Sequence, residues 1–304
     1  MKTPLCIYHS PCADGFTAAW VVRKYFNGEV DFLPRGYGDP TPFEVEGRDV
    51  IMVDFSFKRP TLDQMAKSAH SILILDHHKT AQEDLADAWP IPSGPDFPSK
   101  TEWLVNTVFK CGSRMGHYFA LFDKARSGAG LAWDFFFEGA PRPTLINLVE
   151  DRDLWRFQFD MSRHLHSVLT SHPWNFDVWD EIDARMVSPR DRSALMDEGR
   201  AIHRKLMKDI REVLQAGTRR MTIGGVSVPV ANVPGVMSSE AGNAMALGEP
   251  FAATYHDSSE GRFFSLRSDA AAGMDVAAIA KRYGGGGHRN AAGFRRPIGW
   301  EGDT

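Results

Sequence analysis

Short, uninterrupted apolar runs are the clearest feature of the first eighty residues. Leu5–His9, Val50–Val53 and Ile72–Leu75 lack the polar alternation that marks a strand with one wet face. Such runs are typical of strands buried on both sides, as in a parallel sheet covered by helices. A weaker run, Val30–Leu33, predicts a further strand.

The segments between and after these runs have helical rather than strand-like spacing. Phe16–Tyr25 places its large apolar residues on one side, and Pro60 suits the first turn of a helix over Pro60–Ala69. Ser127–Phe137 and Leu145–Trp155 predict two more helices, the second ending in an acidic cluster. Strands that alternate with helices predict an α/β fold with a mainly parallel N-terminal sheet.

The second half of the chain begins with a long amphipathic pattern at Ser193–Gln215, rich in charged residues. We interpret it as a connecting helix, and a dimer contact is the alternative role. After it a smaller α/β unit is expected, with strands at Val226–Val233, Phe251–His256 and Arg262–Arg267 and helices at Ser239–Ala246 and Asp275–Tyr283. A chain of 304 residues can form two domains of ~100–200 residues each, and we place them at 1–190 and 221–304 with the connector at 191–220.

Composition narrows the classes of protein and partner. Hydrophobic residues make up 43% of the chain and charged residues 24%, as in an ordinary globular protein. The net charge of −4 provides no general basic field for long duplex DNA, so a nucleic-acid substrate would be short or locally held. Cys6, Cys12 and Cys111 form no CxxC pair, which indicates a reducing compartment. Without a signal-type segment or an apolar run near ~20 residues, we expect a cytoplasmic protein that makes no membrane contact.

Polar side chains follow three of the predicted strands. Carboxyl ends of parallel strands meet at one edge of a sheet, where open α/β folds bind ligands. Two adjacent histidines after one strand are as compatible with a plain loop as with a functional site. Three strands that each end in such polar side chains favour a functional site. The residues are His9, with Cys12 and Asp14 just beyond it, then Asp54, and then Asp76, His77 and His78.

Imidazoles and carboxylates without cysteine pairs suit Mn²⁺ or Mg²⁺, or another divalent ion, better than structural zinc. Two such ions ~3.5–4 Å apart can clamp the attacking and leaving oxygens of a phosphoryl group. Asp54 is the best-placed carboxylate to bridge them. The acidic cluster at Glu150, Asp151 and Asp153 is a further source of ligands, although a solvated helix end would also explain it.

A glycine run near the C-terminus predicts an anion site. Glycines let backbone N–H groups approach an anion closely, and neighbouring basic side chains add donors. A run of glycines alone is more often a flexible turn, but here a basic pair follows it and a strand ending in arginine precedes it. The residues are Gly284, Gly285, Gly286, Gly287, His288, Arg289 and Arg267.

Five segments resemble, in order, the motifs of the DHH/DHHA1 phosphoesterases, with the closest likeness to the nanoRNase-like branch of oligoribonucleases and cyclic-nucleotide phosphodiesterases. They are Tyr8–Trp20, Val53–Ser56, Leu75–His78, Glu150–Trp155 and Gly284–Phe294. The resemblance implies a Rossmann-like DHH domain with a dinuclear, usually Mn²⁺-dependent, centre. It also implies a smaller C-terminal DHHA1 domain that holds the far end of the substrate.

Carried over by motif, the resemblance implies a role for each residue. His9 and Asp54 would hold one ion, and Asp14, Asp54, His77 and Asp151 the other, with Asp153 as the alternative to Asp151. Asp76 would support the ligand histidine, His78 would contact the scissile phosphate or protonate the leaving oxygen, and Arg267, His288 and the glycine loop would bind phosphate. Many family members have aspartate where this chain has Cys12, which is either a softer ligand or a small packed residue.

These observations predict a metal-dependent phosphodiesterase. Its substrates would be short oligonucleotides or small linear or cyclic nucleotide diesters, and its products mononucleotides. One alternative is a phosphomonoesterase or polyphosphatase that uses the same metals and releases inorganic phosphate. Another is a nucleotide-binding protein whose catalysis is weakened at Cys12.

Overall fold

The structure is a computed structural model that describes residues 2–36, 39–91, 99–109, 118–271 and 273–303. Cys111 lies outside these ranges. The chain divides into two compact units, Met1–Ile202 and His203–Thr304. The division falls within one long helix, α9 (Pro189–Gly217), which covers the segment predicted as a connector. Across the described ranges, no helix is both long enough and apolar enough to cross a membrane.

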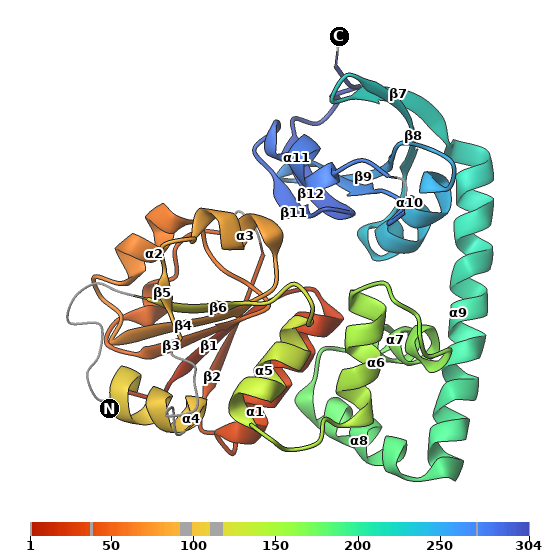
Figure 1. Ribbon diagram of the computed structural model, residues 1–304. Coiled ribbons are helices and arrows are strands. Elements are labelled where there is room, and N and C mark those ends of the chain that lie inside the picture. Colours follow the sequence, from red (N-terminus) through yellow and green to blue (C-terminus); the bar gives the residue numbers. More distant parts are fainter. Residues whose placement is uncertain (1, 37–38, 92–98, 110–117, 272, 304) are drawn as a thin grey trace. The chain divides into compact units, whose positions relative to one another are not determined.

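The first unit is built on a six-stranded sheet in the order β2-β1-β3-β4-β6-β5 (Figure 1). Every strand pairing described in it is parallel, which confirms the predicted fold class. The strands are β1 (Leu5–His9), β2 (Asp31–Arg35), β3 (Asp49–Val53), β4 (Ser71–Asp76), β5 (Trp89–Pro90) and β6 (Phe119–Phe122).

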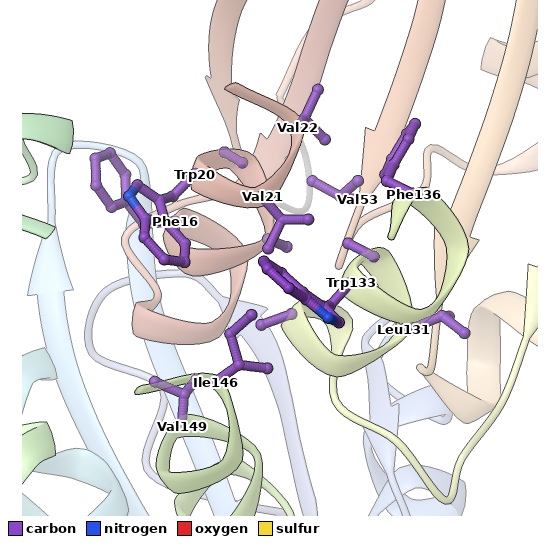
Figure 2. Packing of buried hydrophobic residues seen from close by; sticks show 14 of the residues in the cluster. Phe16, Trp20, Val21, Val22, Val53, Leu131, Trp133, Phe136, Ile146 and Val149 are labelled. Atoms are coloured by element: carbon purple, nitrogen blue, oxygen red, sulfur yellow. The ribbon is translucent and has the colours of Figure 1, made fainter. Parts of the chain in front are cut away.

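Successive residues of the central strands enter two different cores. In β3, Ile51 and Val53 belong to one core, and Val50 and Met52 to the other. Full burial of such a side chain contributes about 1.5–3 kcal/mol, so both faces stabilise the sheet and neither tolerates polar alternation. The first core includes α1 (Ala13–Tyr25), α5 (Gly128–Phe136) and α6 (Thr144–Asp153), as Figure 2 shows, and the second includes α2 (Arg59–Met65).

Several helices of this unit differ from the sequence prediction. Helix α1 begins at Ala13 rather than Phe16, so that Asp14 lies in its first turn. Two helices that the sequence analysis did not identify follow α6, although their buried apolar residues recur at helical spacing: Leu165, Val168 and Leu169 in the first, and Trp179, Ile182 and Met186 in the second. The remaining helical segments are α3 (Lys79–Asp84), α4 (Lys100–Trp103), α7 (Met161–Ser171) and α8 (Phe176–Val187), with a 3₁₀ turn at Phe43–Val45 and a π-helical turn at Leu104–Phe109.

The second unit has its own six-stranded mixed sheet, in the order β11-β12-β10-β9-β8-β7. Only the β8–β9 pairing is parallel among those described. The strands are β7 (Arg219–Ile223), β8 (Val226–Asn232), β9 (Ala252–Ser258), β10 (Gly261–Arg267), β11 (Gly286–His288) and β12 (Ala291–Arg296). The helices are α10 (Ser238–Ala246), which follows a 3₁₀ turn at Gly235–Met237, and α11 (Val276–Lys281).

The N-terminus of α5 lies so close to Asp54 that only glycine fits there. A Cβ atom on Gly128 would lie 2.4 Å from the Cβ of Asp54. We therefore expect Gly128→Ala to lower the free energy of unfolding by about 1–3 kcal/mol, the usual cost of overpacking. Gly217→Ala is the control, because among the described residues beyond its own turn of α9 none places a heavy atom within 4 Å of its added Cβ. Urea unfolding of both variants checks this, and equal stabilities would contradict the close approach.

Candidate metal centre

Three adjacent strands deliver the predicted site residues to one edge of the first sheet. Tyr8 of β1 pairs with Val53 of β3, and Val53 pairs with Leu75 of β4. The residues that follow them are therefore level with one another. The structure brings His9, Asp54 and Asp76 together in this way.

Asp54 lies at the centre of this group. Its backbone has a φ of +54°, a left-handed conformation that aspartate adopts more readily than most residues. Oδ1 lies 2.9 Å from Nε2 of His77, and Oδ2 lies 3.5 Å from Nδ1 of His9. The two carboxylate oxygens thus face different histidines, as a carboxylate that bridges two ions must.

Asp14 reaches the same group from the first turn of α1. Its carboxylate accepts hydrogen bonds from the backbone N–H groups of Gly128 (2.6 Å) and Ala129 (3.0 Å), at the N-terminus of α5. A helix N-terminus favours a negative charge. Oδ2 of Asp14 also lies 3.7 Å from Nε2 of His77. The sequence analysis missed these two amides, although the helix start Ser-Gly-Ala-Gly was a signal for them.

The two aspartates at the end of α6 have different surroundings. Asp153 places Oδ2 at 3.6 Å from Nε2 of His77. The Asp151 carboxylate instead accepts hydrogen bonds from the backbone N–H groups of Gln158 (2.8 Å) and Phe159 (3.2 Å), and from the Ser162 hydroxyl. Residues two apart on a helix do not face the same way. The structure therefore brings Asp153 into the site and uses Asp151 to hold the turn after α6.

Asp76 contacts the two histidines that follow it. Its Oδ1 accepts hydrogen bonds from the backbone N–H groups of His77 (2.7 Å) and His78 (3.2 Å) and lies 2.7 Å from Nδ1 of His78. The imidazole that Asp76 supports is thus that of His78, and not that of His77 as expected. Among the described residues, none donates a hydrogen bond to Oδ2 of Asp76, which is buried.

The ligand-type atoms form overlapping sets. Cys12, half-buried, lies just before α1, and its Sγ belongs to a set with His9 and Asp54 in which the donor atoms all lie within 4.8 Å of one another. Two further sets meet the same distance limit. One is Asp14, His77 and Asp153, and the other is Asp54, Asp76 and His78.

The carboxylates crowd one another electrostatically. Burial, and then the charges of Asp54 and Asp153, raise the pKa of Asp14 well above its usual value. Burial also raises the pKa of Asp153. Burial acts on Asp54 in the same direction, but the hydrogen bonds of His77 and His9 outweigh it and hold the pKa of Asp54 well below its usual value. The histidines therefore offset only part of the negative charge.

The residues present fit divalent cations. A buried carboxylate oxygen with no donor is costly, and in the described part of the chain Oδ2 of Asp76 is one. The crowded carboxylates of Asp14 and Asp153 need positive charge as well. Oxygen and imidazole donors are those that Mn²⁺ and similar ions use.

In the second unit, Arg267 and His288 lie at the same level of the sheet, one strand apart. Both pair with Ala291, Arg267 from β10 and His288 from β11. The Arg267 guanidinium donates to the Ser239 hydroxyl (2.8 Å) and to the Leu266 carbonyl (2.9 Å). The structure thus brings these two predicted substrate residues near each other.

The glycine run has a structural role of its own. The N–H groups of Gly284 and Gly285 donate to the Lys281 and Ala280 carbonyls, both at 3.0 Å, and end α11. Gly286 pairs with Gly293 in the β11–β12 hairpin. Gly287 has a φ of +138° and leaves no room for a Cβ beside the backbone of β12. Two of the N–H groups predicted to cradle a phosphate are therefore already used within the chain, and Arg289 is exposed in the turn that follows.

Comparisons with known proteins give distant likenesses. No protein-family model matches the chain. Protein R106 of Acanthamoeba polyphaga mimivirus, described as uncharacterized, is 26% identical over 319 residues, which is 96% of this chain and 67% of R106. The structure of RecJ from Thermus thermophilus in complex with Mn²⁺ superimposes with a TM-score of 0.46 at 15% identity, over 96% of this chain and 49% of RecJ. The pGpG-specific phosphodiesterase PggH of Vibrio cholerae gives a TM-score of 0.41 at 14% identity, over 97% of this chain and 94% of PggH. The chain spans about half the length of RecJ.

The different surroundings of Asp151 and Asp153 predict opposite effects of the same substitution. Asp153→Asn should weaken Mn²⁺ binding by at least about tenfold to a hundredfold, the loss expected even for an indirect partner of a metal ligand. Asp151→Asn should leave Mn²⁺ affinity near that of the unaltered chain. It should lower the free energy of unfolding by about 1–3 kcal/mol, because a charged acceptor of three hydrogen bonds is lost.

Isothermal titration with Mn²⁺ and urea unfolding measure the two effects separately. The reverse result, with Mn²⁺ affinity sensitive to residue 151 and not to 153, would show that the end of α6 is rotated relative to the arrangement described.

Proposed function

We propose that the chain is a metal-dependent phosphoesterase that cleaves small nucleotide phosphodiesters, including short oligonucleotides, to mononucleotides. The observation that carries this proposal is the position of Asp54, whose two oxygens face His9 and His77. A carboxylate shared between two ligand sets suits a dinuclear centre. Paired divalent ions are a common means of phosphoester hydrolysis.

Two ligand sets meet at Asp54. His9, beside Oδ2, forms one set with Cys12 and Asp54 itself. His77, beside Oδ1, forms the other set with Asp14 and Asp153. When bound, divalent cations would supply positive charge for the phosphoryl oxygens and lower the pKa of a water nucleophile. The contribution of the chain is to hold these ligand side chains at fixed spacing before an ion binds.

His78 is suited to act on the substrate. Burial alone would lower its pKa, but the charge and hydrogen bond of Asp76 more than offset burial and raise the pKa of His78 above its usual value. The contact of Nδ1 with Asp76 fixes the plane of the ring. The Nε2–H can then donate to a phosphoryl oxygen and pass its proton to the leaving oxygen.

The second unit supplies groups suited to a nucleotide. Arg267 and His288 are separated by one intervening strand, or about 10 Å between backbones at the usual strand spacing. A guanidinium and an imidazole at this spacing can contact a phosphate and its neighbouring nucleoside. The net charge of −4 favours a small substrate over a long strand, which would need an extended basic track.

The test is hydrolysis of a 5′-phosphorylated dinucleotide in the presence of Mn²⁺. Mononucleotides should accumulate, and Asp54→Asn should lower kcat by about a hundredfold or more, since several kcal/mol of charge stabilisation would be lost. Asp191→Asn, at an exposed position in α9, is the matched control and should keep full activity.

Product analysis separates the alternatives. Inorganic phosphate released from polyphosphate or a monoester, with the dinucleotide left intact, would replace the proposal with a phosphomonoesterase or polyphosphatase. Dinucleotide binding without turnover in any divalent metal would indicate a nucleotide-binding protein instead.

A further inference from the structure

The two ligand sets that meet at Asp54 differ in chemistry. The set of His9, Cys12 and Asp54 offers one nitrogen, one sulfur and one oxygen. The set of Asp14, His77 and Asp153 offers one nitrogen and only carboxylate oxygens besides. The difference between them is the thiol of Cys12.

The backbone explains why Cys12 and Asp14 serve different sets. Cys12 is the N-cap of α1, with extended φ and ψ of −149° and 133°, and its side chain makes no capping hydrogen bond. Asp14, two residues later, is inside the helix and is held by the amides of Gly128 and Ala129. The turn from extended chain to helix therefore separates the thiol from the carboxylate.

Cys12 does not have the surroundings of a packed core cysteine. Cys6 is such a residue, with 0% of its surface exposed in the apolar core of β1. Cys12 is half-buried and has an imidazole and a carboxylate within 4.8 Å of its sulfur. Neither cysteine forms a disulfide.

We propose that the metal centre is chemically asymmetric, with Cys12 as a thiolate ligand that makes the set on the His9 side select a softer divalent ion such as Zn²⁺ or Co²⁺. The set on the Asp153 side selects Mn²⁺ or Mg²⁺. Thiolates favour softer ions, and carboxylates favour harder ones. A sulfur–metal bond forms as the thiol releases its proton to solvent, and no atom changes oxidation state. This inference rests on the metal centre of the proposed function.

Co²⁺ added to the metal-free full-length chain provides a direct spectroscopic test. Thiolate ligation gives an intense near-ultraviolet charge-transfer band that nitrogen and oxygen ligands do not give. The band should appear in the unaltered chain and in Cys6→Ala and Cys111→Ala, and it should vanish in Cys12→Ser and Cys12→Asp. Serine and aspartate are both preferred N-cap residues, so these two variants are expected to fold.

Metal competition gives a second, independent measurement. After dialysis against an excess of Mn²⁺ with limiting Zn²⁺, elemental analysis should find one ion of each kind per chain. In Cys12→Asp the preference for Zn²⁺ over Mn²⁺ should fall by at least about tenfold to a hundredfold, while two ions are still bound.

The possible failures are distinguishable. Two Co²⁺ ions bound without a charge-transfer band would overturn the role of Cys12 and leave the proposed function intact. A band that persists in Cys12→Ser would assign the thiolate to another cysteine and likewise overturn it. Absence of any bound ion would remove the metal centre, and the proposed function with it.

Discussion

The concentration of carboxylates at one buried edge is the constraint on which the site depends. Asp14, Asp54 and Asp76 are each at most 2% exposed, and Asp153 joins them through His77. Negative charge at this density is stable only where hydrogen bonds and cations balance it. The amides of α5 stabilise Asp14, and His78 stabilises part of Asp76, but the raised pKa values of Asp14 and Asp153 show that the balance is incomplete. Divalent cations would complete it.

The fold meets this constraint with central strands that are apolar between their ends. Strands β1, β3 and β4 are buried along both faces, so the polar groups appear only where the strands end. Helices α1, α5 and α6 pack on one face and bring their own ends to the same edge. Because these elements are held by the core, the ligands are positioned before any ion arrives, which lowers the cost of ordering them on binding.

The sequence predicted the parts of this arrangement that follow from local pattern. All-apolar runs predicted the parallel sheet, and the rule for strand ends predicted that His9, Asp54 and Asp76 would meet. The choice between Asp151 and Asp153 depended on how α6 is rotated against its neighbours, which is set by packing between distant segments. The glycines near the C-terminus were interpreted as an anion loop, whereas the structure uses Gly284 and Gly285 to end α11 and pairs Gly286 and Gly287 with β12. A run of identical residues contains no local signal that shows which of them end a helix and which pair with a strand.

The central claim is that Asp54 bridges two divalent ions. Anomalous X-ray diffraction from crystals of the chain grown in saturating Mn²⁺ would test it most directly. Two anomalous peaks are predicted, about 3.5–4 Å apart. Asp54 should lie between them, with Asp153 beside one and Asp151 beside neither. A single peak, or two peaks that Asp54 does not join, would contradict the account.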